Sequence, residues 1–246
     1  MPPAATTRLY WLDGHSVEAD ARVVGIREGA IATDQTCFYP GGGGQPSDEG
    51  TVTFEGGAVA PVSGAHADAD GVIWHDLAVP PPSDAVGQAV RLAVNRERRE
   101  VLARYHTVLH VLNTVALRDY SAWITGVQIG VDYSRIDFKW EGFSAALSAE
   151  VEAKVNAVLA ADHRLRAYSL AEEEFASRPG LLRTLEVKPP VIGGRVRVVE
   201  IEGFDAQACG GTHVASTGEI GRFSIFRVEN KGRINKRLYV RLSAAG

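Results

Sequence analysis

The sequence predicts an α+β protein in two parts. Residues 1–94 are expected to form a small antiparallel β-barrel, because short apolar runs there are broken by Gly, Asp and Pro at close spacing. Residues 95–246 are expected to form a mostly antiparallel sheet packed with helices. In that part a long helical pattern starts at Asn95, and strand-like runs then alternate with a second helical pattern.

Four runs in the first part have the length and composition of strands. They are ARVVGIREG at 21–29, AIATD at 30–34, GTVTFEGG at 50–57 and VIWHDLA at 72–78. The run VPPPSD at 79–84 predicts a rigid turn within the same module.

The segment DQTCFYPGGGGQPSDEG, residues 34–50, contains four consecutive glycines. Backbone N–H groups of such a run can cradle a phosphate, but the Lys-Ser/Thr of a P-loop and the Gly-x-Gly-x-x-Gly spacing are both absent. Two interpretations stay open. The run is either a flexible turn that only connects strands, or a loop that approaches a binding site, where a methyl group at Gly42 or Gly43 would find no space.

The second part begins with a helix that Asn95 can cap and whose first turn, RERRE at 96–100, is polar. Its core-facing stripe comprises Val101, Tyr105, Val108, Leu112 and Val115. A second helix is expected over about 148–162. Strand patterns occur at 124–140, 195–203, 221–229 and 237–243.

Two short motifs contain metal-ligand residue types. In HTVLH, His106 and His110 are spaced i,i+4, so both rings lie on one face of the predicted helix. In CGGTH, Cys209 and His213 flank a Gly-Gly turn that lets both side chains approach one point. Each pair alone has an ordinary explanation, namely packed histidines or a buried free cysteine. Together they make a His₃Cys set, so the sequence predicts one zinc ion per chain.

Composition predicts a soluble, cytoplasmic protein that does not enter membranes. The longest apolar runs are too short to span a bilayer, and the start, MPPAATTRLYW, lacks the basic and apolar segments of a signal peptide. Two cysteines form no disulfide framework. With Cys209 assigned to the metal, Cys37 is expected to be a plain thiol.

Basic residues are concentrated near the end of the chain, although the overall net charge is −4. From residue 222 to 241, seven Lys and Arg stand against a single acid, Glu229. Such a run is usually a solvated face, but Asn, Gly and Tyr suited to phosphate contact are interleaved with it. We therefore expect RNA to be bound here through its shape and phosphates. The expected contacts are Arg233, Lys236 and Arg237.

Three motifs carry a family resemblance: HTVLH, CGGTHV with its continuation STGEIGRF, and FYPGGGGQPSDEG. Together they resemble the editing domain of alanyl-tRNA synthetases and the free-standing alanyl-tRNA editing proteins called AlaX. The resemblance runs from about Tyr10 to Leu242 and is to the medium-length form, which acts in trans. The metal motifs are shared with threonyl-tRNA synthetase editing domains, whereas the glycine-rich signature is typical of the alanyl branch. The resemblance implies the class II synthetase editing-domain fold.

The resemblance also implies roles for single residues. The four residues of the two metal motifs correspond to the family's zinc ligands. Gln128 falls where the family places a pocket glutamine, and Asp137 where it places a strand carboxylate, for which we expect a structural role. Thr36 is a candidate pocket hydroxyl. The glycine run is expected to contact substrate or tRNA, and its members are Gly41, Gly42, Gly43 and Gly44.

The activity implied is zinc-dependent hydrolysis of the aminoacyl ester of mischarged tRNA(Ala), chiefly Ser-tRNA(Ala) and in addition Gly-tRNA(Ala), bound at its acceptor stem. Serine is larger than alanine, so the pocket must recognise the serine hydroxyl rather than exclude by size. Gln128 and Thr36 are the polar side chains expected to do so. The metal could activate water or anchor the substrate amino group. The alternative is a non-catalytic tRNA-binding module whose four ligands close a structural zinc site.

Overall fold

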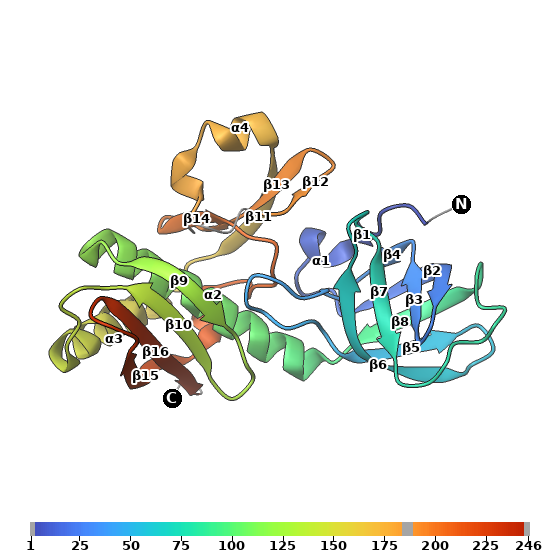
Figure 1. Cartoon of the computed structure of the whole chain (residues 1–246), viewed down its shortest axis with the longest axis horizontal. Coiled ribbons are helices and arrows are strands. Elements are labelled where there is room, and N and C mark those ends of the chain that lie inside the picture. The colour runs from blue at the N-terminus through green and yellow to red at the C-terminus, as the bar shows by residue number, and fades with distance from the viewer. Residues whose placement is uncertain (1–2, 184–188, 244–246) are drawn as a thin grey trace. The chain divides into compact units, whose positions relative to one another are not determined.

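The computed structural model describes residues 3–183 and 189–243 (Figure 1). The chain forms two compact units, one of residues 1–42 and 46–100 and the other of residues 43–45 and 101–246. The division between these units falls after Glu100, inside helix α2 (Arg96–Tyr120). The domain boundary after Val94 stays a prediction. None of the helices in the described ranges combines the length and apolarity that crossing a membrane requires.

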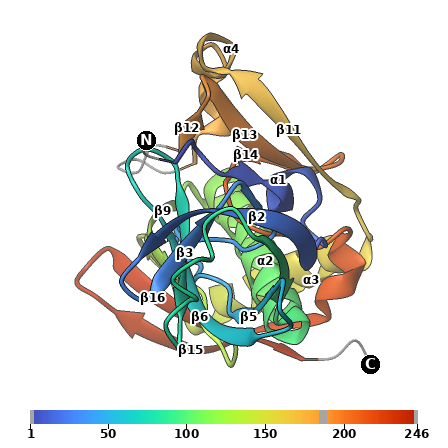
Figure 2. The ribbon, with the colours of Figure 1, turned by 90° about the vertical axis from the view of Figure 1, so that its right-hand side faces the viewer.

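The first unit is built on a closed antiparallel barrel, which confirms the predicted fold of this part. Figure 2 faces the barrel and shows its strands curving around the interior. The strand order is β2-β3-β7-β6-β5-β8. The strands are β2 (Glu18–Arg27), β3 (Ala30–Thr33), β5 (Gly50–Phe54), β6 (Val59–Ala67), β7 (Ile73–Leu77) and β8 (Ala89–Val94). A short parallel pair and one helical turn complete the unit: β1 (Thr7–Arg8), β4 (Gln35–Thr36) and α1 (Leu9–Leu12).

The barrel closes because side chains alternate between its interior and the solvent. Along β8, Val90, Leu92 and Val94 are buried while Ala89 and Arg91 are exposed. Strands β6 and β8 are not among the four runs that the sequence indicates most clearly, although both alternate between buried and exposed residues. Both contain small or polar residues that weaken the apolar pattern.

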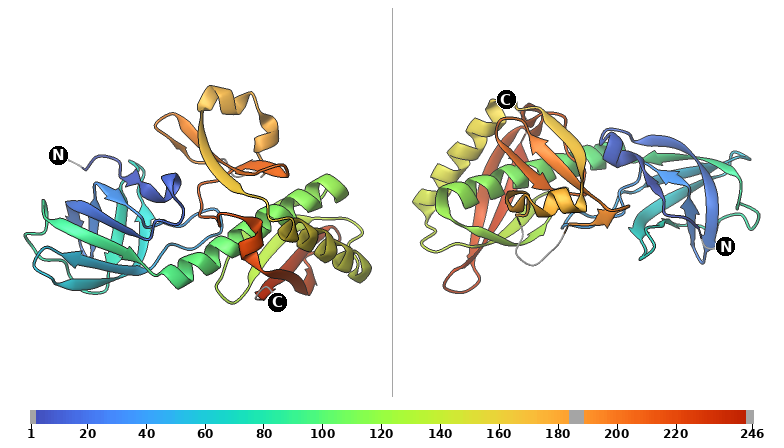
Figure 3. Two further views of the ribbon diagram at one scale, coloured as in Figure 1. Left: turned by 180° about the vertical axis from the view of Figure 1, so that it is seen from behind. Right: turned by 90° about the horizontal axis from the view of Figure 1, so that it is seen from above.

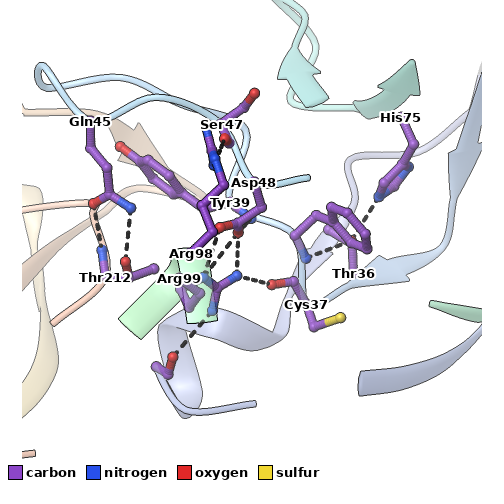
Figure 4. Close-up of polar contacts among 12 residues, drawn as sticks. Thr36, Cys37, Tyr39, Gln45, Ser47, Asp48, His75, Arg98, Arg99 and Thr212 are labelled. Atoms are coloured by element: carbon purple, nitrogen blue, oxygen red, sulfur yellow. Dashed lines mark hydrogen bonds and ion pairs between the residues drawn. The ribbon is translucent and has the colours of Figure 1, made fainter. Parts of the chain in front are cut away.

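A buried ion pair holds the two ends of the glycine-rich segment together. The Arg99 guanidinium contacts the Asp48 carboxylate, and both side chains are almost fully inaccessible to solvent. The same guanidinium donates to Cys37 O at 2.7 Å, and Asp48 accepts from Tyr39 N at 2.6 Å (Figure 4). Because Cys37 and Tyr39 precede the glycines and Asp48 follows them, this pair fixes the base of the loop.

The second unit contains a four-stranded antiparallel sheet with two helices on one side (Figure 3). Its strand order is β15-β16-β10-β9. The strands are β9 (Trp123–Gln128), β10 (Ser134–Lys139), β15 (Arg222–Asn230) and β16 (Asn235–Ser243). Helix α2 and helix α3 (Ala145–Ala160) bury their apolar faces against this sheet, in a core that includes Val108, Leu112, Ile136, Val155 and Leu238. This arrangement confirms the predicted sheet packed with helices.

Capping residues explain where the helices begin. The side-chain oxygen of Asn95 accepts from Arg98 N at 3.1 Å, as the sequence predicts. Helix α3 begins at Ala145, three residues earlier than expected, because the Ser144 hydroxyl accepts from Leu147 N and caps it. The sequence pattern predicts a start at Ser148, the next serine along the chain.

A second antiparallel sheet in this unit positions the CGGTH turn. Strand β13 (Arg195–Ile201) pairs with β11 (Leu165–Ala171), β12 (Val191–Ile192) and β14 (Asp205–Ala208). The remaining elements are α4 (Glu172–Ala176) and the 3₁₀ turns η1 (Pro179–Leu181) and η2 (Thr217–Ile220). Strand β11 was not predicted, because Leu170 is its only fully buried side chain and no apolar alternation marks it. Strand β14 leads directly into Cys209.

Candidate metal centre

Four predicted ligands converge at one point in the second unit. His106 and His110 project from α2, and Cys209 and His213 lie on the turn that follows β14. Their ligand atoms all lie within 4.8 Å of one another. Cys209 Sγ is 3.4 Å from His106 Nε2 and 3.3 Å from His213 Nε2. Donors of a tetrahedral zinc site are about 3.5 Å apart, since the bonds are about 2.0–2.3 Å long. This cluster could therefore hold one metal ion.

A buried glutamine orients the His106 ring. Gln45 Oε1 lies 2.7 Å from His106 Nδ1 and accepts from Thr212 N at 3.2 Å, while Gln45 Nε2 donates to the Thr212 hydroxyl at 2.8 Å. Figure 4 shows the two bonds between Gln45 and Thr212. Because Thr212 N can only donate, it identifies the glutamine oxygen as the atom beside the ring. His106 therefore carries its proton on Nδ1 and presents the lone pair of Nε2 to the cluster.

A threonine gives His213 the same tautomer. The Thr107 hydroxyl donates to Ala103 O at 2.8 Å, so its oxygen accepts from His213 Nδ1, which lies 3.1 Å away. The lone pair of His213 Nε2 then faces Cys209 Sγ. Two of the three imidazoles are thus held in the protonation pattern that a metal ligand requires.

Burial keeps the imidazoles neutral. Desolvation lowers the pKa of His110 to about 4 and takes the pKa values of His106 and His213 well below their usual range, and the nearby Arg197 charge acts in the same direction. Desolvation also raises the pKa of the Cys209 thiol. Neutral imidazoles and a thiol that needs a nearby positive charge to ionise form a donor set suited to a divalent cation.

The second sheet holds the ligand turn in place. Arg197, buried on β13, donates from Nη1 to Cys209 O at 3.0 Å and to Gly211 O at 2.9 Å. A methyl group at Gly211 would collide with the His106 ring, so only glycine fits at that position. Gly211 therefore allows close packing of the turn against α2.

The glycine run delivers Gln45 to the cluster. Gly44 adopts φ +82, and a methyl group there would collide with the Val127 side chain and carbonyl. Gly44 O also accepts from Ile129 N at 2.8 Å. By contrast, a methyl group at Gly43 meets nothing within 4 Å, and one at Gly42 meets only the Tyr39 hydroxyl at 3.5 Å. The expected lack of space is thus found at Gly44, not at Gly42 or Gly43.

Sequence comparisons give this cluster a family context. A profile described as "Threonyl and Alanyl tRNA synthetase second additional domain" matches residues 196–239, which include Cys209 and His213. A second profile, "tRNA synthetases class II (A)", matches residues 10–98. Both matches lie within the span over which the motifs showed their resemblance.

Full-length relatives decide the family. The chain is 38% identical over 243 residues to a Methanosarcina mazei protein named alanyl-tRNA editing protein AlaX-M, with 96% of each chain covered. A Saccharolobus solfataricus protein of the same name is 35% identical, with 95% of this chain and 98% of that one covered. The chain belongs to the alanyl-tRNA editing protein family. It is also 38% identical to the alanine–tRNA ligase of Korarchaeum cryptofilum, of which it matches 25%.

For this member of the editing-protein family, the structure places Thr36 inside the barrel. Thr36 is completely buried, its hydroxyl lies 2.8 Å from His75 Nε2 and it accepts from Phe38 N at 3.0 Å (Figure 4). A hydroxyl in that position supports the barrel and is not presented to a substrate. The expected pocket role came from a polar residue type at the entrance to the glycine motif, which says nothing about the direction of its side chain.

Gln128 and Asp137 lie on the sheet of β9 and β10. Gln128 is exposed at the end of β9 and lines a cavity of about 370 Å³. The glutamine bonded to a residue of the cluster is Gln45, whose role no local pattern in the sequence indicates. Asp137 accepts two bonds of 2.7 Å from Arg237, which is the structural role expected for this carboxylate.

The three basic residues expected to contact RNA differ in accessibility. Arg233 is exposed. Lys236 is buried, and its Nζ donates to Arg233 O at 3.2 Å, so it is not available as a surface cation. Arg237 is mostly buried and paired with Asp137. A count of charges along the sequence does not reveal such pairing, because the two partners are 100 residues apart.

Proposed function

We propose that this protein is a zinc-dependent hydrolase that removes the wrong amino acid from mischarged tRNA(Ala), chiefly from Ser-tRNA(Ala) and in addition from Gly-tRNA(Ala). The observation that carries the proposal is the buried His₃Cys cluster with two imidazole tautomers preset. The relatives support it, because those that match over the whole chain are named alanyl-tRNA editing proteins.

The ligands of the zinc would be His106, His110, Cys209 and His213. A zinc ion bound there supplies Lewis-acid chemistry, which polarises a carbonyl group and lowers the pKa of water. The protein's own contribution is to hold the donors. Gln45 and Thr107 keep the Nδ1 protons in place, and Arg197 fixes the turn that carries Cys209. Preset donors need little rearrangement during the reaction.

Discrimination against the correct product is proposed to depend on a polar contact with the serine hydroxyl. A site built to hydrogen-bond a hydroxyl rejects the analogue that lacks it, because its own polar groups would be left unpaired. Gln128 is the side chain we propose for this contact. Its chain neighbour Val127 lies directly against Gly44, so Gln128 is near in space to the segment that carries Gln45. Thr36 is left out of the proposed pocket because its hydroxyl is used inside the barrel.

The test is deacylation of matched substrates by the purified, zinc-loaded protein. Ser-tRNA(Ala) should lose its amino acid much faster than in buffer, whereas Ala-tRNA(Ala) should be spared. Gln128→Ala should slow release of serine and leave the zinc content unchanged. Release of serine no faster than in buffer would reject the hydrolase.

The second candidate is a non-catalytic tRNA-binding module. It is favoured by one observation, namely that four protein ligands can close a structural zinc site. This module would bind zinc and tRNA(Ala), and in its presence Ser-tRNA(Ala) would lose serine no faster than in buffer. The assay is repeated with serine attached to a threonine-specific tRNA. Faster release of serine from that tRNA than from tRNA(Ala) would identify a threonyl-type editor.

A further inference from the structure

Three aromatic rings form a cluster on the outer face of the β15-β16-β10-β9 sheet, the face opposite α2 and α3. Tyr133 lies 6.0 Å from both Phe226 and Tyr239, and Phe226 lies 6.2 Å from Tyr239, measured between ring centroids. Tyr133 is 46% exposed and Phe226 is 44% exposed. Exposed aromatic rings gathered at one place mark an interaction surface more often than isolated ones do.

Arginines are interleaved with these rings. The guanidinium carbon of Arg227 lies 4.9 Å from the centre of the Tyr239 ring, and that of Arg241 lies 4.4 Å from the centre of the Phe226 ring. Tyr239 is also in register with Arg135 on β10, which in turn is in register with Gln128 on β9. Residues in register on an antiparallel sheet share a face, so one row across the sheet joins Gln128, Arg135, Tyr239 and Arg227.

This sheet is strongly basic in a chain that is acidic overall. Residues 131–139 and 222–243 contain nine Lys and Arg against three Asp and Glu, a net charge of +6, while the whole chain carries −4. Two of the acids are already engaged, Asp137 by Arg237 and Glu229 by Arg227 and Lys231. Among the residues that the structure describes, no carboxylate pairs with Arg135 or Arg241.

A cavity lies beside the aromatic cluster. It has a volume of about 370 Å³, within the range of about 300–1,000 Å³ typical of small-ligand sites. Its lining combines aromatic, cationic and amide groups and includes Gln128, Asp132, Tyr133, Arg135 and Tyr239. Aromatic walls suit a planar base, and the arginine and the glutamine suit a phosphate and the polar edge of a base.

We propose that this outer face binds the unpaired 3′-terminal nucleotides of the RNA substrate. At least one base would stack on Tyr133 beside the cavity, and phosphates would lie against Arg135 and Arg241. The inference rests on the proposed function for the identity of the RNA. It deepens that function by naming the surface that holds the single-stranded end near Gln128.

The charge of the face favours RNA over a protein or a second copy of this chain. A second copy would bring its own Arg135 and Arg241, both without a carboxylate partner among the described residues, against this face and would be repelled. Unpaired nucleotides match both the exposed aromatic rings and the positive charge of this face, because every base can stack on a ring and every phosphate is an anion. Duplex RNA matches only the positive charge, because its bases are already stacked on one another.

A binding cycle tests the proposal. Dissociation constants are measured by fluorescence anisotropy for two uncharged RNAs, tRNA(Ala) and the same tRNA lacking its unpaired 3′ nucleotides. Tyr133→Leu keeps a bulky apolar side chain but removes the stacking ring. It should weaken binding of the intact tRNA about tenfold, in line with the loss of one stacked base, and leave binding of the truncated tRNA unchanged.

Tyr168→Leu is the matched control, because Tyr168 is a half-buried ring beside an arginine, Arg166, on strand β11 of the other sheet. It should change neither constant. Equal weakening for both RNAs, or none, would overturn the proposal. A wild-type dimer that Tyr133→Leu dissociates in sedimentation would also overturn it and assign the face to a second copy.

The cycle uses uncharged RNA, so its outcome is independent of hydrolysis. If serine is not released but Tyr133→Leu weakens binding of intact tRNA only, the proposed hydrolase activity is wrong and the proposed binding surface is supported. If serine is released but Tyr133→Leu does not have this effect, only the proposed binding surface is wrong. Zinc content and circular dichroism of both variants show whether they are folded.

Discussion

Gln45 accepts a hydrogen bond from His106 across 2.7 Å, although 61 residues separate the two in the chain. The glutamine is only 2% exposed, and Thr212 holds its amide from the other side. This contact means that the glycine-rich segment supplies the support of a metal ligand. It gives that segment a task that a plain connector lacks.

Loss of the Gln45 side chain should weaken metal binding. Gln45→Ala removes the acceptor that fixes the His106 tautomer, and such losses cost about 10–100-fold in metal affinity. Gln45→Glu, which keeps an acceptor oxygen, should retain most of the affinity. Competition with a chromogenic zinc chelator measures the change. Gln88→Ala, at a half-buried glutamine of the barrel unit, is the control. Equal affinity in Gln45→Ala and the parent would remove Gln45 from the site.

The two cysteines should respond differently to substitution. Cys209→Ala removes a ligand, so zinc content should fall below one per chain and deacylation should fall with it. Cys37→Ala should keep the zinc content and the deacylation activity of the parent, since Cys37 is buried in the barrel core. Elemental analysis and the serine-release assay give the two readouts. Full zinc occupancy with lost activity in Cys209→Ala would instead assign Cys209 to substrate geometry.

Neighbouring glycines of the run should also differ. Gly44→Ala places a methyl group against Val127, so the segment that carries Gln45 must move, and zinc affinity and serine release should both fall by about tenfold or more. Gly43→Ala meets no neighbour and carries only the backbone strain of φ +55, about 1 kcal/mol of folding stability. A Gly44→Ala protein with parental zinc affinity would show that the loop accommodates the methyl group.

The buried histidine of the barrel should make stability depend on pH. Burial lowers the pKa of His75 from its usual 6.5 to about 4. A folded-state pKa below the unfolded value means that the unfolded chain binds the proton first. The contribution of His75 to stability is therefore complete above pH 6.5 and declines as the pH falls toward 4.

The size of this effect at pH 5 is about 2 kcal/mol. His75→Gln keeps a polar partner for Thr36 but does not titrate, so its urea midpoint should fall less than the parental midpoint between pH 7.5 and pH 5. Comparing the two proteins isolates His75 from the buried histidines of the metal centre. Equal pH dependence in both would show that His75 does not bind a proton on unfolding.

Features that depend on local sequence were predictable. The i,i+4 spacing of His106 and His110 sets both rings on one face of a helix whatever surrounds it, and Asn95 caps that helix through a contact three residues away. The barrel strands that the sequence reading found, such as β2 and β7, carry their apolar residues in short runs bounded by turns. In each case the interaction that decides the structure joins residues close in the sequence, so the local sequence pattern reveals it.

Features that depend on contacts between distant segments were decided only by the tertiary structure. Nothing local to Gln45 indicates that it bonds to His106, and nothing local to Arg237 reveals its pairing with Asp137, 100 residues away. Thr36 and Lys236 look like available polar groups in the sequence, yet packing buries both. Burial and pairing of a side chain depend on which distant segments pack against it. The sequence determines that packing only through the fold as a whole.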